Sequence, residues 1–386
     1  MKNQKIILWP FIIIAYLGMF SFGLYDNSRG PIYPSILKNF NILPSVGSWI
    51  FVFSSLAGLC TTLVGHVWLK RLGTYKSMQV SFFMQVLASL FMGLSCQFGY
   101  HFYFILLSSF AFGVSSGILS ICANIMISHS VDVATRRRTF SGLHSMYGLA
   151  SLLAPVLINI CYLSNIEWNQ YFYLMIFIPG LTLILSFFLK TPTHIHTPGI
   201  NHLVPRASFK IIIFPSFLFG IYVASEIIVS SQLVYFLEVS HHFTKPTSNY
   251  YLSLFFLTLL LGRLTFTVIK LPFKSLHWLF ISLISSLVLF MMGLWVHPIF
   301  LPLLGLTQSF FYPCAMDWLY EKHQSLADSI VPYIMTSISL SLIIMHFMVG
   351  LLAVYFGINK AMYLGPCLVI VALLGIIIER RFPLKN

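Results

Sequence analysis

Charged residues are scarce in this chain. They make up 8% of its 386 residues, whereas an ordinary soluble domain carries roughly 25%. Hydrophobic residues make up 58%. This balance excludes an ordinary water-soluble protein and predicts a polytopic membrane protein.

Cysteine patterns and catalytic signatures are lacking as well. The six cysteines are scattered singly, without the spacing of a metal or redox site, at positions 60, 96, 122, 161, 314 and 367. Cys96 and Cys161 fall near the outer ends of predicted helices, and whether they pair is left open. No Ser-His-Asp spacing, phosphate-binding loop or dinucleotide fingerprint is present. The sequence therefore predicts no enzyme activity, no cofactor and no metal site.

Long apolar runs dominate instead. A membrane-spanning helix needs about 20 mainly apolar residues, and Gly, Pro and charged residues separate such runs here. They predict twelve spans, at residues 7–37, 46–69, 75–96, 100–129, 138–162, 168–190, 209–238, 247–269, 275–296, 299–319, 327–356 and 359–379.

The middle of the chain divides these spans into two sets. Residues 191–208 form a polar linker without a long apolar run, and the sequence FGLY at 22–25 recurs as FGIY at 219–222. The offset is 197 residues (219 minus 22). We predict two six-helix bundles, at 1–190 and 209–386, joined by a cytoplasmic linker and related as parallel repeats.

Basic residues indicate the orientation. Of the 22 Lys and Arg residues, one side of the predicted spans receives all but Arg29, Lys38, Lys245 and Lys360. By the positive-inside rule that side is cytoplasmic, and both termini lie there. This topology accounts for the net charge of +13 without a nucleic-acid partner. We expect a multi-pass protein of a cell membrane, of the bacterial inner-membrane type.

Three ionisable residues fall inside predicted spans. Asp26 and Arg29 lie in the first span, and at the repeat offset Arg29 corresponds to Glu226 in the seventh. A charge at the bilayer centre costs roughly 2.5–3.5 kcal/mol, so such residues usually face a partner or a watery cavity. Two alternatives remain open. Asp26 and Arg29 neutralise each other, or Arg29 pairs with Glu226 in one conformation and leaves Asp26 to take a proton or bind solute.

Several polar and aromatic side chains are candidates for lining a solute cavity: Tyr25, Asn124, His144, Tyr222, Gln232 and Gln308. The alternative for each is ordinary packing, because a lone helix histidine more often packs with a hydrogen bond and aromatic residues often face lipid. Glu226 is the strongest functional candidate, since it is the only acid well inside its span.

Residues 65–76, GHVWLKRLGTYK, lie between the second and third spans and resemble the loop signature of the major facilitator superfamily, roughly G-x-x-x-D-R-x-G-R-K. Lys70 stands where that signature has an acid. Simple positive-inside anchoring explains the bases equally well. The candidate residues of this cytoplasmic gate are Gly65, Lys70, Arg71, Gly73, Lys76 and Arg263.

A narrower resemblance is to the fucose-permease-like branch of that superfamily. Residues 117–124, GILSICAN, resemble its G-x-L-E-x-x-x-N, residues 142–155 resemble its L-H-x-x-x-G-x-G-x-x-x-G-P, and residues 222–226, YVASE, are similar to its Y-V-G-x-E. The acid of that branch in span four is Ser120 here, and its acid in span one aligns with Gly30. Either the carboxylates that couple transport to protons lie at other positions in this chain, or its transport is coupled in a different way.

The resemblance implies an all-α membrane protein with twelve transmembrane helices in two pseudo-symmetric six-helix bundles. It also implies alternating-access transport of a small polar, sugar-like solute coupled to protons. The expected partners are that solute, protons and the lipid bilayer, and we expect a monomer. Two alternatives stay open: a proton-driven exporter of an amphipathic compound such as a drug, siderophore or lipid-like molecule, and a membrane sensor that binds its ligand without transport.

Overall fold

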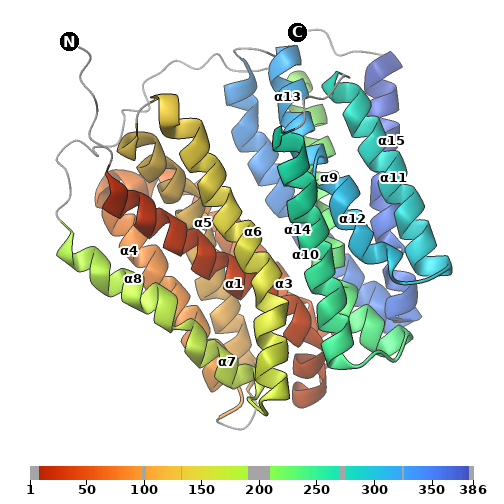
Figure 1. Cartoon of the computed structure of the whole chain (residues 1–386), viewed down its shortest axis with the longest axis horizontal. Coiled ribbons are helices and arrows are strands. Elements are labelled where there is room, and N and C mark those ends of the chain that lie inside the picture. Colours follow the sequence, from red (N-terminus) through yellow and green to blue (C-terminus); the bar gives the residue numbers. More distant parts are fainter. Residues whose placement is uncertain are drawn as a thin grey trace. The chain divides into compact units, whose positions relative to one another are not determined.

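The computed structural model describes residues 8–97, 101–131, 133–189, 209–268, 274–323 and 326–381. Regular structure within these ranges is helical throughout (Figure 1). The helices are α1 (Trp9–Phe40), α2 (Pro44–Gly47), α3 (Trp49–Leu63), α4 (Gly65–Leu94), α5 (Phe102–Ser130), α6 (Val133–Leu163), α7 (Trp168–Met175), α8 (Phe177–Phe188), α9 (Phe209–Ser240), α10 (Lys245–Val268), α11 (Ser275–Trp295), α12 (Phe300–Gln308), α13 (Phe311–His323), α14 (Ala327–Ala361) and α15 (Leu364–Arg381).

These helices account for the predicted spans. Nine stretches among the described residues are long and apolar enough to cross a membrane, counting α2 with α3 and α7 with α8. The remaining predicted spans correspond to α10, to α12 with α13, and to α15. α10 begins with the polar residues 245–249, α12 and α13 are interrupted at Ser309 and Phe310, and α15 ends in charged residues. The predicted all-α membrane fold is confirmed.

Two glycines turn the chain between spans. Gly73, with φ of 71°, interrupts α4, and Gly357, with φ of 78°, interrupts α14. A residue with a Cβ pays roughly 1–2 kcal/mol for this left-handed backbone, a penalty that glycine avoids. Gly73 therefore separates the second predicted span from the third, and Gly357 separates the eleventh from the twelfth.

The chain forms two compact units by its internal contacts. The first unit comprises residues 1–41 and 53–202, and the second comprises residues 42–52 and 203–386. The linker predicted at 191–208 lies outside the described residues, so the two bundles with the boundaries drawn from the sequence stay a prediction.

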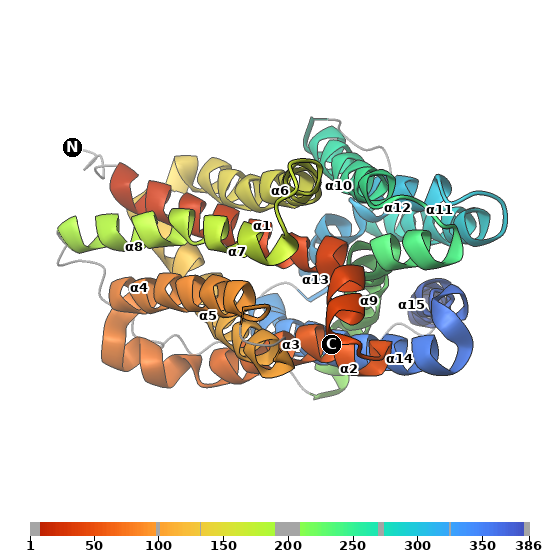
Figure 2. The same ribbon diagram turned by 90° about the horizontal axis from the view of Figure 1, so that it is seen from below.

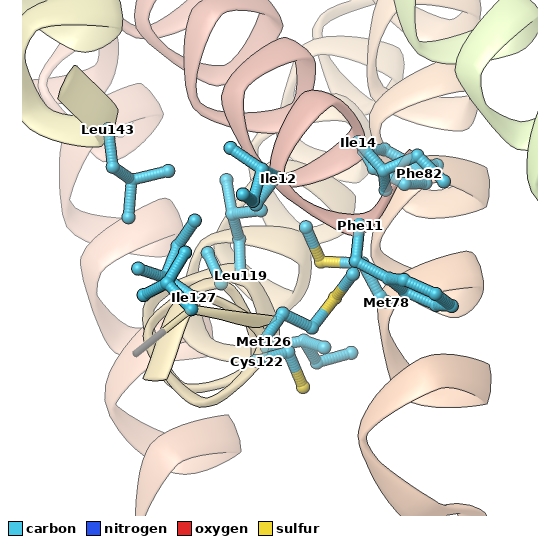
Figure 3. Close-up of a cluster of buried hydrophobic side chains, with 14 of the residues drawn as sticks. Phe11, Ile12, Ile14, Met78, Phe82, Leu119, Cys122, Met126, Ile127 and Leu143 are labelled. Carbon is cyan, nitrogen blue, oxygen red and sulfur yellow. The ribbon is translucent and has the colours of Figure 1, made fainter. Parts of the chain in front are cut away.

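A cluster of apolar side chains joins the helices of the first unit (Figure 3). α1 contributes Phe11, Ile12 and Ile14, which pack against side chains of α4, α5 and α6. α4 and α5 run side by side along much of their length (Figure 2). Because lipid tails are as apolar as these side chains, close packing rather than exclusion of water holds such helices together.

Small residues bring neighbouring helices into backbone contact in both units. A Cβ on Gly117 of α5 would lie 2.8 Å from a carbonyl oxygen of α3, and one on Gly113 would meet the carbonyl oxygen of Ser54. In the second unit, a Cβ on Gly305 of α12 would meet the carbonyl oxygen of Phe255 on α10. Glycine thus permits the close approach by which transmembrane helices pack.

Candidate functional site

An acid and a base share one face of α1 in the first unit. The Asp26 carboxylate forms an ion pair with Arg29 through Oδ1, and the Tyr147 hydroxyl of α6 donates a hydrogen bond to Oδ2 at 2.8 Å. The two charged residues are three apart, a spacing that brings side chains together on a helix. The self-neutralising pair, one of the two alternatives drawn from the sequence, is therefore formed.

Arg29 is the more deeply buried partner. Its side chain is 8% exposed, against 24% for Asp26. The guanidinium donates to Oγ of Ser54 at 2.6 Å and lies over the ring of Phe112, 4.6 Å from its centroid. An arginine stays charged at any accessible pH. Removing Asp26 would therefore leave a buried charge without its counter-ion.

Stacked aromatic rings surround this pair. Phe112 stacks on Tyr25, with centroids 4.5 Å apart, and on Phe22 at 5.1 Å. The Tyr25 hydroxyl is hydrogen-bonded to Ser108. Tyr25, predicted as a cavity residue, is 3% exposed, so in this conformation its ring belongs to a packed stack.

The second unit repeats the pattern with other partners. Glu226 lies near the middle of α9, and its Oε1 is 3.5 Å from a guanidinium nitrogen of Arg263 on α10. The Tyr222 hydroxyl donates to Oε2 at 3.1 Å. Here the acid is the buried partner, since the Glu226 side chain is 14% exposed and that of Arg263 is 40% exposed. Arg29 belongs to the other unit, so its predicted pairing with Glu226 stays a prediction.

The sequence predicts Arg263 at the cytoplasmic end of its span, among the gate residues. The structure brings its side chain to Glu226, well inside the neighbouring helix. Arginine has a long stem that carries its charge away from its own backbone position. Spacing along the sequence did not reveal this partner.

Tyr222 also contacts the break between α12 and α13, the two halves of the interrupted tenth span. Its hydroxyl donates to the backbone carbonyl of Gln308, the last residue of α12. Its ring stacks on Phe311, the first residue of α13, with centroids 3.7 Å apart. The Gln308 side chain is 1% exposed, and both of its amide atoms lack a hydrogen-bond partner among the described residues. An unsatisfied buried polar group costs about 1–3 kcal/mol, so a ligand or conformation that supplies its partners is favoured.

The other predicted cavity residues differ in their exposure. Asn124 of α5 is exposed and donates to the carbonyl of Ser120 on its own helix at 2.6 Å. His144 of α6 is exposed, whereas Gln232 of α9 is buried. In this conformation Asn124 and His144 lie at the protein surface, whereas Gln232 is packed inside the protein.

The predicted gate signature folds as helix around a single turn. Gly65 begins α4, Lys70 and Arg71 are exposed on its first part, Gly73 makes the turn, and Lys76 is exposed beyond it. The prediction described a loop here. Residues 66–72 contain no glycine or proline, so the helix that begins at Gly65 continues to Gly73.

A further ion pair in the second unit was not found from the sequence. Lys322 of α13 pairs with Glu379 of α15, and its ammonium lies 5.4 Å from the centroid of the Trp318 ring. The side chains of Lys322 and Glu379 are 18% and 6% exposed. The two residues are 57 apart in the chain, a separation that no helical or strand period links.

The cysteines and the metal-binding residue types form no site within the described ranges. All six cysteines are free, including Cys96 and Cys161. Among the described residues, no group of three or more His, Cys, Asp or Glu side chains is placed to hold a metal ion.

Comparison with known proteins identifies the family. A family model described as Major Facilitator Superfamily matches residues 15–330. The chain belongs to the major facilitator superfamily. A search of curated protein sequences gives no match.

Solved structures share the fold of this superfamily member over almost its whole length. A D-xylose-proton symporter superposes with a TM-score of 0.76 at 12% identity, covering 98% of both chains. The nucleoside transporter NupG gives 0.73 at 12% identity, with 95% of this chain and 99% of that one covered. The E. coli fucose:proton symporter FucP gives 0.65 at 14% identity, with 98% and 100% covered. At these identities the likeness shows the fold alone.

The family and the spans together give the class of protein. This major facilitator protein is a multi-pass membrane transporter and not an enzyme. The family resemblance drawn from short motifs such as residues 65–76 and 222–226 is confirmed.

Proposed function

We propose that this major facilitator protein is a proton-coupled secondary transporter of a small polar solute that works by alternating access. The observation that carries the proposal is Glu226, a largely buried carboxylate in the middle of α9 whose two oxygens face Arg263 and Tyr222. Ionisable groups buried inside membrane spans mark substrate and ion pathways. A carboxylate can be neutralised by a proton, whereas a guanidinium cannot be deprotonated in a protein.

The two units supply different parts of this mechanism. Glu226 binds the coupling proton, and Asp26 with Arg29 provides a permanent charge pair. Protonation of Glu226 removes the charge that attracts Arg263, whose side chain is exposed enough to be solvated. The relative free energies of the inward-open and outward-open states change as a result. Arg29 could also pair with Glu226 in another conformation. Protonation of Glu226 would then weaken that pair as well.

A sugar-like solute suits the candidate side chains. Hydroxyl groups are bound well by amides, which both donate and accept hydrogen bonds, and Gln308 has an amide without partners among the described residues. Tyrosine rings have apolar faces on which a sugar can stack, and Tyr25 and Tyr222 lie beside the two charged clusters. Their rings are stacked on Phe112 and Phe311 in this conformation, so they would meet the solute in another one. Structural neighbours named for D-xylose, fucose and nucleosides support a polyhydroxylated solute.

We also propose a monomer in a bacterial inner membrane, with both termini cytoplasmic. The one-sided distribution of Lys and Arg supports this orientation. Alkaline phosphatase, which is active only outside the cytoplasm, tests it when fused to the C-terminus. We expect an inactive fusion, and an active one would reverse the proposed topology.

Purified protein in proteoliposomes tests the coupling. Radiolabelled D-xylose, L-fucose and uridine are offered under an inward proton gradient, with a pH probe inside the vesicles. We expect gradient-driven accumulation accompanied by proton entry for at least one of them. Glu226→Gln keeps the shape of the side chain but cannot bind the proton, so it should abolish accumulation and retain counterflow. Glu238→Gln, on the same helix near its outer end, is the matched control and should retain both.

The outcomes separate the candidate functions. Unchanged, proton-dependent accumulation by Glu226→Gln would remove this residue from the coupling. Gradient-driven efflux of amphipathic dyes without uptake of the polar solutes would indicate an exporter. Binding of a solute without any flux would indicate a sensor.

A further inference from the structure

Tyr222 has one hydroxyl hydrogen and two acceptors within reach. The carbonyl oxygen of Gln308 and Oε2 of Glu226 both lie at hydrogen-bond distance from its Oη. When Glu226 is ionised, the two acceptors compete for that single hydrogen. When Glu226 carries a proton, its own O–H donates to Oη, and the Tyr222 hydrogen remains on the carbonyl.

The carbonyl belongs to a weak point of the backbone. α12 ends at Gln308 and α13 begins at Phe311. Pro313 has no N–H, so the carbonyl of Ser309 lacks the donor that a continuous helix would provide four residues later. A side chain, Tyr222, supplies a hydrogen bond to the last carbonyl of α12. The hydroxyl therefore stabilises the place where the helix is interrupted.

α9 also contacts the other side of the break through aromatic rings. The Tyr222 ring stacks on Phe311 at an interplanar angle of 13°. Phe219, about one turn earlier on α9, meets Tyr312 edge to face with centroids 5.3 Å apart. The ring contacts hold α13 whatever the position of the hydroxyl hydrogen, whereas the hydrogen bond alone joins Tyr222 to the end of α12.

We propose that Tyr222 is a positioning residue that couples the protonation of Glu226 to the break between α12 and α13. With the proton on Glu226, a chain of hydrogen bonds runs from the carboxyl group through Oη to the Gln308 carbonyl, and the break is held. When Glu226 releases its proton to water, the Tyr222 hydrogen turns to the carboxylate. The Gln308 carbonyl then loses its donor, and α12 is free to move against α13. This inference rests on the proposed role of Glu226 as the proton-binding group.

The acceptor of the Tyr222 hydrogen depends on whether Glu226 is protonated. Arg263 of α10 faces Oε1, and Tyr312 of α13 lies near Arg263. Tyr222 faces Oε2 from the same helix as Glu226. The charge of Glu226 therefore decides which acceptor receives the Tyr222 hydrogen.

Hydrogen–deuterium exchange of the full chain in lipid nanodiscs tests the coupling without knowledge of the solute. Peptides covering residues 305–316 are followed as pH is raised, after correction for intrinsic exchange rates. We expect exchange at the break to rise about fivefold with pH in the wild type, the net effect of losing one hydrogen bond. Tyr222→Phe keeps the ring stack and removes the hydroxyl, so its exchange should be fast at every pH. Glu226→Gln should be slow at every pH, because its amide N–H replaces the carboxyl O–H.

Tyr147→Phe is the matched control, because Tyr147 bonds the acid of the first unit in the same way. It should keep the wild-type pH dependence at residues 305–316. A Tyr222→Phe variant that keeps this dependence would overturn the proposal, as would a Glu226→Gln variant that still responds to pH.

Transport measurements separate this inference from the proposed function. Coupled transport with a break insensitive to pH overturns the inference alone, and a Tyr222-dependent response without coupled transport overturns the function alone.

Discussion

The two units hold one chemical pattern in opposite arrangements. In each, a carboxylate near the middle of a long helix gives one oxygen to an arginine and the other to a tyrosine hydroxyl. In the first unit the arginine is the buried partner and follows its acid on α1. In the second unit the acid is the buried partner, and its arginine comes from the next helix, α10.

This difference separates a charge that cannot be lost from one that can. A buried guanidinium needs its counter-ion at every pH, because it stays protonated. A buried carboxylate accepts a proton, and its partly exposed arginine can then be left to water. The same three groups therefore suit a permanent ion pair in the first unit and a proton switch in the second.

Removing the acid of each unit should give the largest difference in stability between the two units. Asp26→Ala removes the carboxylate that forms an ion pair with the buried Arg29, and we expect a loss of about 3–5 kcal/mol in the free energy of unfolding. Glu226→Ala leaves Arg263, which is 40% exposed, so we expect a loss below about 1 kcal/mol for the pair. Thermal unfolding of both variants in the same detergent measures the difference.

The double variant Asp26→Ala with Arg29→Met is the control for this asymmetry. It removes both charges, so it should recover most of the stability lost by Asp26→Ala alone. Equal losses for Asp26→Ala and Glu226→Ala would contradict the assignment of the buried charge to different partners in the two units.

Glycine contacts should give an intermediate effect that is the same in both units. Gly113→Val forces a side chain against the carbonyl of Ser54, and Gly305→Val forces one against that of Phe255. We expect each to cost about 3 kcal/mol, the upper end for overpacking. Gly180→Ala, whose Cβ would lie 3.8 Å from its nearest neighbours, is the control and should be close to neutral. A clear difference between the two valine variants would show that the units do not pack alike.

The smallest effects are expected for two lysines near helix ends. Lys322→Gln leaves Glu379, 6% exposed, without its ion pair, and we expect a cost of about 1 kcal/mol, because glutamine still donates a hydrogen bond. Lys70 is exposed, so Lys70→Gln should change stability by less than about 0.5 kcal/mol. Chemical denaturation of the two variants compares them, and an equal loss would mean that the Lys322 pair contributes nothing.

The family, the spans and the charged residues inside them could be predicted from the sequence. Apolar runs of spanning length locate the helices, and a charge within such a run stands out because it is costly. The pair of Asp26 with Arg29 was also predictable, since three residues is the spacing of one helix face. The hydropathy of residues 299–319 continues across the break at Ser309 and Phe310, and its signal in the sequence is Pro313, which cannot donate a hydrogen bond to the carbonyl of Ser309.

Only the tertiary structure decided which base meets which acid between helices. Arg263 lies 37 residues after Glu226 (263 minus 226), and Lys322 lies 57 residues before Glu379. The sequence by itself determined that these charges exist and on which helices they lie, because helix formation depends on local composition. Their partners depend on how the helices pack, since residues separated by whole helices become neighbours only when side chains of different elements fit together.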